Sequence, residues 1–539
     1  MDYLEQAKRF VEEEKQFQLG FLPTEQSSPL TRGLDQTFAK SAAAGVRALQ
    51  RVDRNVLEMA RRVLVGEAFA ALVDAGEKAL RQGHKLVFSG CGATGRLSIL
   101  LESMWRGHGG EGVFSLMTGG DYALVRSVEF FEDYQEFGRQ QVRELGMDKG
   151  DVLVAITEGG ETSSVLGTVD EATARGCQAF LLFNNPAALL RERLERCRQA
   201  LDNPAVTVLD LCCGPMAVAG STRMQATSSE QLVAGAALEE IARRLAGNDS
   251  PKPDFAAVFE SLLDQLGSDA AVAALAEHVE FEESLYRSHG LVTYFADEFL
   301  LDIFTDTTER SPTFMLPPFR KGDDTVSPQS WAFVKNPLLP TAEAWRHCFK
   351  RAPRCLNWNR ADYGRMGAAD RIAANPPKLD AAELLKFSIG SEDMPCRRMG
   401  VPNAAVMLGS GPELSAAFER QAAPYQERRR LELPLRPLPS RLRLMERLGM
   451  KLALNTISTG TMARLGRLSG NWMSHVDVSN KKLLDRGTRL IAELANVAYA
   501  DACAELFRSV EELKAVPPGA ERPSPVQHAL RRLRGQCGH

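Results

Sequence analysis

The sequence GCGATGR at residues 90–96 decides how the rest of the chain is interpreted. An apolar run at 85–89 precedes it and is typical of a buried parallel strand, and an amphipathic run at 97–105 follows it and indicates a helix. A glycine-rich turn from strand to helix directs free backbone N–H groups and the positive helix end at one point. This stretch therefore predicts an anion site, with a phosphate bound by Gly92, Ala93 and Thr94.

The same spacing also fits G-x-G-x-x-G, the fingerprint of dinucleotide-binding folds. That interpretation requires an acidic residue at the end of the next strand to hold a ribose. Asp121 is the candidate, but it follows two glycines in a turn, and no later segment is typical of a nicotinamide site. Dinucleotide binding and a tight turn without ligand remain alternatives.

Composition and charge are those of an ordinary globular protein. The chain of 539 residues is long enough for two or three domains, with 44% hydrophobic and 25% charged residues. Its net charge of −4 gives no reason to expect nucleic acid or an anionic membrane as a partner. The ten cysteines lack metal-ligand spacing, so we expect reduced thiols, no metal and no cofactor.

Targeting and nucleic-acid signals are also weak. The first residues are charged where a signal peptide needs an apolar core, and no apolar run approaches the roughly 20 residues that span a bilayer. We therefore expect a cytoplasmic protein. The run 428–430 is Arg-Arg-Arg, but prolines follow it and aromatic residues are not interleaved, which favours a solvated or interdomain face.

The first half alternates between strand and helix patterns. This alternation predicts an α/β fold with a doubly wound parallel sheet, whose ligands lie at the carboxyl ends of the strands. The expected strands are 86–89, 113–117, 152–156, 179–183 and 206–211, with helices at 96–107, 127–145 and 162–176 between them.

Two further loops at that edge carry glycines and hydroxyls. One is TEGGETSS at 157–164, and the other is GSTR at 220–223, before a helix at 224–246. Each alone is typical of a helix N-cap, but three such loops on one edge favour a sugar-phosphate site. The candidate ligand-binding residues in them are Thr157, Gly159, Gly160, Thr162, Ser221, Thr222 and Arg223.

These motifs resemble a known family. The segments 90–97, 119–121, 220–224, 451–460, 470–473 and 479–483 are similar to those of sugar isomerase (SIS) domains, and more narrowly of N-acetylmuramic acid 6-phosphate etherases and glucokinase regulatory proteins. The resemblance implies two flavodoxin-like SIS domains with additional helices. It also places Lys451, on a polar helix face with Asn455 and Thr459, at the sugar; without the resemblance, that face would be read as solvated.

The second half predicts a degenerate α/β unit. Strands are expected at 291–296, 313–316, 385–389, 404–408 and 431–433, with helices at 298–308 and 412–422, while 317–384 has no clear order. Carboxylates at 297 and 298 occupy the helix start where a phosphate would lie, so this unit should lack its own anion site.

The resulting division of the chain has six parts. We expect a helical arm at 1–50, a first SIS domain at 51–245, a helical linker at 246–285, a second SIS domain at 286–444, helices completing the site at 445–513, and a mobile tail at 514–539.

The resemblance also assigns two carboxylates. Glu132 matches the etherase residue that removes a proton, whereas the position of the etherase acid is Met104 in the first half. The segment 306–314 of the second half places Glu309 at the acid position instead. One composite site at the interface of an internal pseudo-dimer, in a monomeric chain, would then hold both.

Three functions agree with this pattern. The first is a lyase that cleaves the lactyl ether of N-acetylmuramic acid 6-phosphate. The second is a sensor without activity that binds a sugar phosphate and a protein partner such as a sugar kinase. The third is an aldose–ketose phosphate isomerase, which also needs a base at C2.

Overall fold

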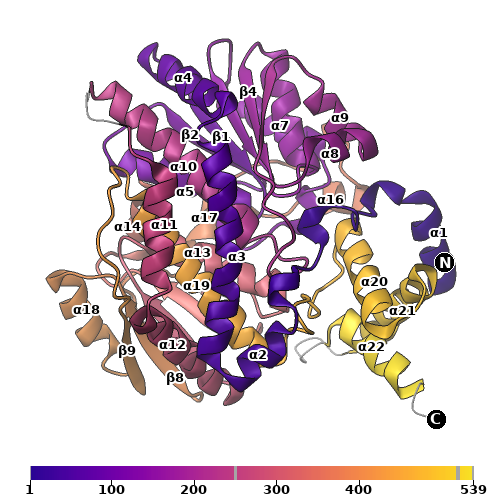
Figure 1. Ribbon diagram of the computed structural model, residues 1–539. Helices are drawn as coiled ribbons and strands as arrows, with labels where there is room; N and C mark the ends of the chain where they lie inside the picture. The colour runs from indigo at the N-terminus through magenta and orange to yellow at the C-terminus, as the bar shows by residue number, and fades with distance from the viewer. Residues whose placement is uncertain (1, 248–251, 517–522, 537–539) are drawn as a thin grey trace.

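The structure is a computed structural model that describes residues 2–247, 252–516 and 523–536. It contains two separate sheets with parallel strands throughout, one near the top and one near the bottom of Figure 1. The first sheet has the order β2-β1-β3-β4-β5. Its strands are β1 (Leu86–Gly90), β2 (Val113–Met117), β3 (Val152–Ile156), β4 (Gln178–Phe183) and β5 (Val206–Asp210).

The second sheet repeats this order without a fifth strand. Its order is β7-β6-β8-β9, and each neighbouring pair is parallel. The strands are β6 (Leu291–Phe295), β7 (Ala332–Lys335), β8 (Asn403–Leu408) and β9 (Glu427–Leu431). The predicted class, two doubly wound α/β units with extra helices, is confirmed.

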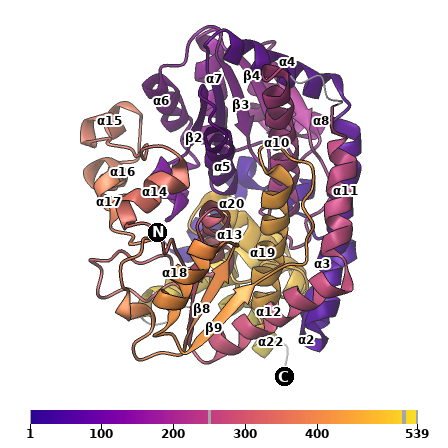
Figure 2. The same ribbon diagram turned by 90° about the vertical axis from the view of Figure 1, so that its left-hand side faces the viewer.

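Equivalent helices of the two units contact each other between the sheets. Helix α5 (Ala93–Gly107) follows β1 and packs on α13 (Leu300–Phe314), which follows β6. Likewise α10 (Gln225–Leu245) packs on α19 (Leu444–Arg464), and Figure 2 shows these four helices in the middle of the molecule. This is the arrangement of an isologous dimer interface, formed here within one chain.

Most of the remaining helices surround the two sheets, while α1, α20, α21 and α22 pack together on one side of the molecule. In the first half they are α1 (Tyr3–Glu13), α2 (Leu34–Lys40), α3 (Ala42–Val63), α4 (Glu67–Arg81), α6 (Gln135–Leu145), α7 (Ser163–Ala174), α8 (Ala187–Arg193) and α9 (Glu195–Leu201). In the second half they are α11 (Phe255–Leu266), α12 (Asp269–Arg287), α14 (Thr341–Phe349), α15 (Arg360–Arg365), α16 (Asp370–Ala374), α17 (Ala381–Leu385), α18 (Pro412–Ala422), α20 (Lys481–Ala495), α21 (Tyr499–Glu512) and α22 (Pro525–Gln536).

The turn after β1 requires its glycines. A Cβ atom on Gly90 would lie 2.4 Å from the backbone of Thr94, so no side chain fits there. Gly92 has φ of +57°, in the left-handed region that favours glycine. These two residues let the chain leave a fully buried strand and enter α5 within a very short turn.

Several predicted elements are wrong, most of them in the second half. The segment 313–316 is not a strand, because α13 continues through Pro312 to Phe314. The segment 385–389 contains no strand either: α17 ends at Leu385, and β7 supplies the edge strand instead. The strand expected at 431–433 lies earlier, at 427–431, and the helix expected at 127–145 begins only at Gln135.

The predicted linker and tail are both part of the packed structure. Within the expected linker, 248–251 lie outside the described residues, but α11 and most of α12 fall within 252–285 and pack on α3 and α19. Within the expected tail, 517–522 and 537–539 lie outside the described residues, but α22 packs on α20 and α21 with Val526 and Leu530 buried. The expected boundary at 50/51 falls inside α3.

The N-terminal helix α1 and the C-terminal helices α20, α21 and α22 lie on one side of the molecule (Figure 1). Helix α1 packs on α21, where the Phe10 and Phe507 rings lie 6.1 Å apart. In the described part of the chain, none of the helices has the length and apolar character that crossing a membrane requires. The nine cysteines in those ranges are free thiols.

Candidate functional site

A cavity of about 120 Å³ lies where the predicted loops of the first sheet meet the second half of the chain. The first half contributes the starts of α5 and α7 and the loop before α10, and the second half contributes α13 and α20. Of the predicted ligand-binding residues, those that line it are Gly92, Ala93, Thr162, Ser221, Thr222 and Arg223. Because the first N–H groups of a helix have no intrahelical partner, the start of α5 offers donors to an anion here.

Both predicted carboxylates, Glu132 and Glu309, line this same cavity. The Glu132 carbonyl accepts a hydrogen bond from Ser164 N at 3.0 Å, in the first turn of α7, and its carboxylate accepts one from Lys482 Nζ at 2.9 Å. Glu309, on α13, forms an ion pair with Arg96, a fully buried residue of α5. The two halves of the chain thus each bring one carboxylate to a shared cavity.

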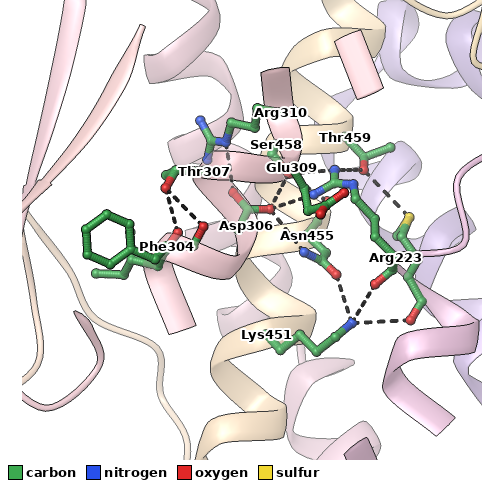
Figure 3. Close-up of polar contacts among 12 residues, drawn as sticks. Arg223, Phe304, Asp306, Thr307, Glu309, Arg310, Lys451, Asn455, Ser458 and Thr459 are labelled. Carbon is green, nitrogen blue, oxygen red and sulfur yellow. Dashed lines mark hydrogen bonds and ion pairs between the residues drawn. The ribbon is translucent and has the colours of Figure 1, made fainter. Parts of the chain in front are cut away.

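Arg223 connects the cavity to the second half through Asp306 on α13 (Figure 3). Arg223 Nη1 donates to Asp306 Oδ1 at 2.8 Å, and Arg310 Nε donates to the other carboxylate oxygen at 2.8 Å. Burial acts to raise the pKa of Asp306, but the two guanidinium groups outweigh it and hold the pKa below its usual range. Arg223 lines the cavity, and its Nε atom is buried without a hydrogen-bond partner.

Lys451 does not line the cavity, contrary to the position expected for a sugar contact. Its ammonium is buried and donates to the carbonyls of Arg223 and Met224 and to Asn455 Oδ1 at 3.0 Å (Figure 3). It also donates to Ser228 Oγ at 2.8 Å. Burial, helped by Arg223, lowers the pKa of Lys451 to about 7. Lys451 therefore fixes the loop that carries Ser221 to Arg223 and lies behind it.

Four further predicted residues are also not part of the cavity lining: Thr94, Thr157, Gly159 and Gly160. Thr94 Oγ1 caps its own turn, donating to Cys91 O at 2.9 Å and accepting from Cys91 N at 3.0 Å. Thr157 Oγ1 donates to Thr162 Oγ1 at 3.0 Å. Their hydroxyls support the two loops, and the backbone of the loops forms the surface.

Sequence reasoning missed Glu158, which lines the cavity between two loops. Its carboxylate accepts from Thr227 Oγ1 at 2.8 Å. Burial, followed by the negative charge of Glu309, raises the pKa of Glu158 to about 7. This carboxyl therefore retains a proton in near-neutral solution, which its loop position alone does not indicate.

Sequence reasoning also missed the cations supplied by α20. Lys482 lines the cavity and contacts both Glu132 and Glu161, at 2.9 and 3.4 Å. Arg486 lines it as well and pairs with the buried Glu25 of the N-terminal arm at 2.6 Å. The signal that could have found them is the motif 479–483, in which Asn480 caps α20 and fixes where the next residues point.

Glu161, the second acidic residue of the loop at 157–164, has a cationic partner in the fold. Glu161 is buried, and Lys482 offsets its charge, so the loop does not present an isolated carboxylate. The cavity then combines carboxylates with Lys482, Arg486 and Arg223, a set that suits a ligand with one anionic end and several hydroxyl groups. The described residues contain no group of three or more His, Cys, Asp or Glu placed to hold a metal ion.

Comparison with known proteins finds relatives of this chain. Residues 68–173 match the family described as the glucokinase regulatory protein N-terminal SIS domain. The chain is 32% identical over 220 residues to an N-acetylmuramic acid 6-phosphate etherase of Yersinia pestis (strain Pestoides F), covering 40% of this chain and 68% of that protein. The etherase of Yersinia pseudotuberculosis serotype O:3 (strain YPIII) matches to the same extent.

Among solved structures, the chain is similar to tagatose-6-phosphate ketose/aldose isomerase from Escherichia coli. The identity is 12% and the TM-score 0.44, over 80% of this chain and 94% of that one.

Proposed function

The chain belongs to the SIS-domain family that includes the N-acetylmuramic acid 6-phosphate etherases, and on this premise we propose that its composite cavity binds an amino-sugar phosphate and cleaves the lactyl ether at C3. The observation that carries the proposal is that Glu132 and Glu309, from different halves of the chain, line one cavity together with the glycine turn of α5. The phosphate lies against the starts of α5 and α7 and the hydroxyls of Ser221 and Thr222.

Glu132 is the proposed base. In the open-chain sugar, the C2 proton is acidified by the neighbouring aldehyde, and Glu132 removes it. The electron pair left on C2 forms the C2–C3 double bond, and the C3–O bond breaks. Lys482 Nζ donates to the Glu132 carboxylate at 2.9 Å and so fixes its position at the cavity wall.

The leaving oxygen needs a proton, and we assign its donor to Glu158. Glu309 occupies the position that resemblance gives to the acid, but its carboxylate is already engaged by the buried Arg96. Glu158 faces the same cavity, and burial together with the charge of Glu309 raises its pKa to about 7. Glu309 then acts by keeping Glu158 protonated and by accepting hydrogen bonds from sugar hydroxyls.

The test is incubation with N-acetylmuramic acid 6-phosphate and enzymatic measurement of released lactate. We expect lactate in proportion to protein, and no release by a Glu132→Gln variant. Isothermal titration with the same compound measures binding separately. Binding without lactate release would remove the lyase and leave the binding function, and absence of binding would remove both.

A specific observation favours a second candidate, a sugar-phosphate sensor without activity. Both Glu132 and Glu309 already have charged partners, in Lys482 and Arg96, before any ligand is bound. Carboxylates fixed in this way can bind sugar hydroxyls without transferring protons. Two measurements together distinguish this case: titration with several hexose phosphates, and the lactate assay on N-acetylmuramic acid 6-phosphate. A sensor binds one of the hexose phosphates and releases no lactate from the ether compound.

A further inference from the structure

A second cavity lies at the other end of the interface between the two units. Its volume is about 130 Å³, close to the volume of about 120 Å³ of the site cavity. It is lined by the end of α5, by Glu298 before α13 and by the loop 441–443 before α19. The site cavity is lined by the start of α5, the body of α13 and the loop 220–223 before α10. Exchanging the two units converts one set of segments into the other, so we call this second space the counterpart cavity.

The counterpart cavity does not repeat the chemistry of the site cavity. By the family resemblance, Met104 holds the position on α5 that Glu309 holds on α13, and Met104 lines the cavity without a carboxyl group. Glu298 lies where an anion would otherwise meet the first N–H groups of α13. A phosphate, which concentrates its charge on one group, would lie beside a carboxylate here. The cavity is therefore unsuited to a second sugar phosphate, and the proposed reaction does not use it.

Four cationic side chains nevertheless line the counterpart cavity: Lys350, Arg441, Arg443 and Arg447. Two of them are already paired. Arg443 forms an ion pair with Glu298, and Arg447 forms one with Asp302 at 2.5 Å. Among the described residues that line the cavity, Glu298 is the one carboxylate, and Arg443 engages it. The positive charges of the other two cations are left without compensation.

These two cations are Lys350 and Arg441, which are both exposed. Within 2–247, 252–516 and 523–536, no carboxylate forms an ion pair with either of them. Lys350 Nζ lies 3.3 Å from His347 Nε2, and Arg441 Nε donates to His108 Nε2 at 3.0 Å. The two Nη groups of Arg441 have no partner in the described chain. They form the planar fork that fits a carboxylate through two parallel hydrogen bonds.

The backbone at two of the lining cations is strained. Lys350 and Arg443 have φ of +55° and +63°, in the left-handed region that favours glycine. Such conformations cost free energy and persist where the surrounding structure or a function maintains them. Glycine at either position would remove the strain together with the charge, so the sequence keeps a cation at this cavity against the preference of the backbone.

We propose that the counterpart cavity binds a small dicarboxylate. Arg441, before α19, binds one carboxylate through its Nη groups, and Lys350, after α14, binds the other. A dicarboxylate divides its two negative charges between its ends, so each end compensates one cation and no single group concentrates charge beside Glu298. The volume is below the roughly 300–1,000 Å³ of typical ligand pockets, which limits the ligand to a short one. This site does not depend on the proposed lyase activity.

Isothermal titration of the protein with malonate, at constant ionic strength, tests the proposal. Monomethyl malonate is the matched ligand, because it has nearly the same size and one carboxylate fewer. We expect malonate to bind roughly tenfold more tightly than the monomethyl ester, since the ester loses a charge-assisted hydrogen bond. Inorganic phosphate, titrated in the same way, should bind more weakly than malonate.

The variants are Arg441→Gln and Lys350→Gln, with Arg428→Gln as the control. Each of the first two should weaken malonate binding by roughly tenfold. Arg428 is exposed on β9, so its variant changes the net charge equally without changing the cavity, and its affinity for malonate should match that of the unmodified protein. Lys350 and Arg441 have no described ion pair to lose, so the melting temperatures of the three variants should agree.

Three results would overturn the proposal. The first is absence of malonate binding, or equal binding of malonate and its monomethyl ester, in the unmodified protein. The second is malonate binding that neither cavity variant weakens, or that Arg428→Gln weakens as much, because the ligand would then lie elsewhere or respond only to net charge. The third is phosphate binding tighter than malonate, with the same dependence on Arg441 and Lys350, which would make the cavity a phosphate site.

Discussion

The carboxyl edges of the two sheets differ, although the strands follow the same order. After β1, the chain enters α5 through Gly92, with backbone N–H groups facing the cavity. After β6, Asp297 and Glu298 precede α13, which begins at Leu300. Carboxylates at a helix start repel an anion, so the second edge is unsuited to phosphate.

The second unit contributes through the body of α13 instead. Asp306 and Glu309 lie on that helix and reach Arg223 and Arg96 of the first unit. The first unit thus provides backbone N–H donors at its helix starts, and the second unit supplies carboxylates across the interface. Helices α5 and α13 therefore occupy equivalent positions in the two units but present different functional groups to the cavity.

The largest expected effect follows from removing a proposed proton-transfer group. Glu132→Gln and Glu158→Gln should each lower the initial rate of lactate release by about 10²–10⁴-fold, because a positioned acid or base contributes that much. Binding, measured by titration calorimetry, should persist in both variants. If Glu158→Gln retains full activity while Glu309→Gln loses it, the proton comes from the second unit and our assignment is wrong.

The next largest effect tests the link between the units. Asp306→Ala leaves Arg223 buried without its carboxylate, whereas Arg310 keeps its pair with Glu282, and breaking a buried pair in this way costs about 3–5 kcal/mol. Urea denaturation followed by circular dichroism measures the loss. A change below about 1 kcal/mol, the usual value for an exposed pair, would mean that this network does not hold the units together.

A smaller effect concerns the pKa of Glu158 in the first unit, which depends on the charge of Glu309 in the second unit. The charge of Glu309 helps to raise the pKa of Glu158, so Glu309→Gln should lower that pKa below about 7. A proton donor must be protonated, and its loss of the proton causes the alkaline fall of the rate profile. This fall should move to lower pH in the variant. The measurement is kcat from pH 5 to 9. If the alkaline fall of the rate stays at the same pH in the variant, the charge of Glu309 does not set the pKa of the proton donor.

The first sheet was predictable because its central strands β1, β3 and β4 are almost entirely buried. Such strands are apolar runs between glycine turns, and the predicted strand 152–156 matches β3 at Val152–Ile156. The second sheet was harder to predict. Strand β7 is buried but has only four residues, and β9 is an edge strand in which exposed and partly buried residues alternate.

Residues of the site could be predicted where a turn requires a particular residue type, as at Gly92. They were harder to predict where tertiary packing determines which side chains line the cavity. The spacing of Lys451 and Asn455 gives a helix face, but not that α10 and α13 cover it. Likewise, Glu158 appears in the sequence as one loop carboxylate among several. Its raised pKa comes from burial and from Glu309, which is distant in sequence.

The smallest expected effect concerns the outer edge of the second sheet, away from the interface. Arg428 and Arg430 on β9 both pair with Glu419 of α18, at 3.4 and 2.9 Å, and all three side chains are exposed. Exposed pairs contribute about 0.2–1 kcal/mol, since water and salt screen them. Glu419→Gln should therefore change the free energy of unfolding by no more than that, in the same urea assay that detects Asp306→Ala. A loss as large as that of Asp306→Ala would contradict the distinction between a buried interface and a solvated edge, because the two carboxylates differ chiefly in their exposure to water.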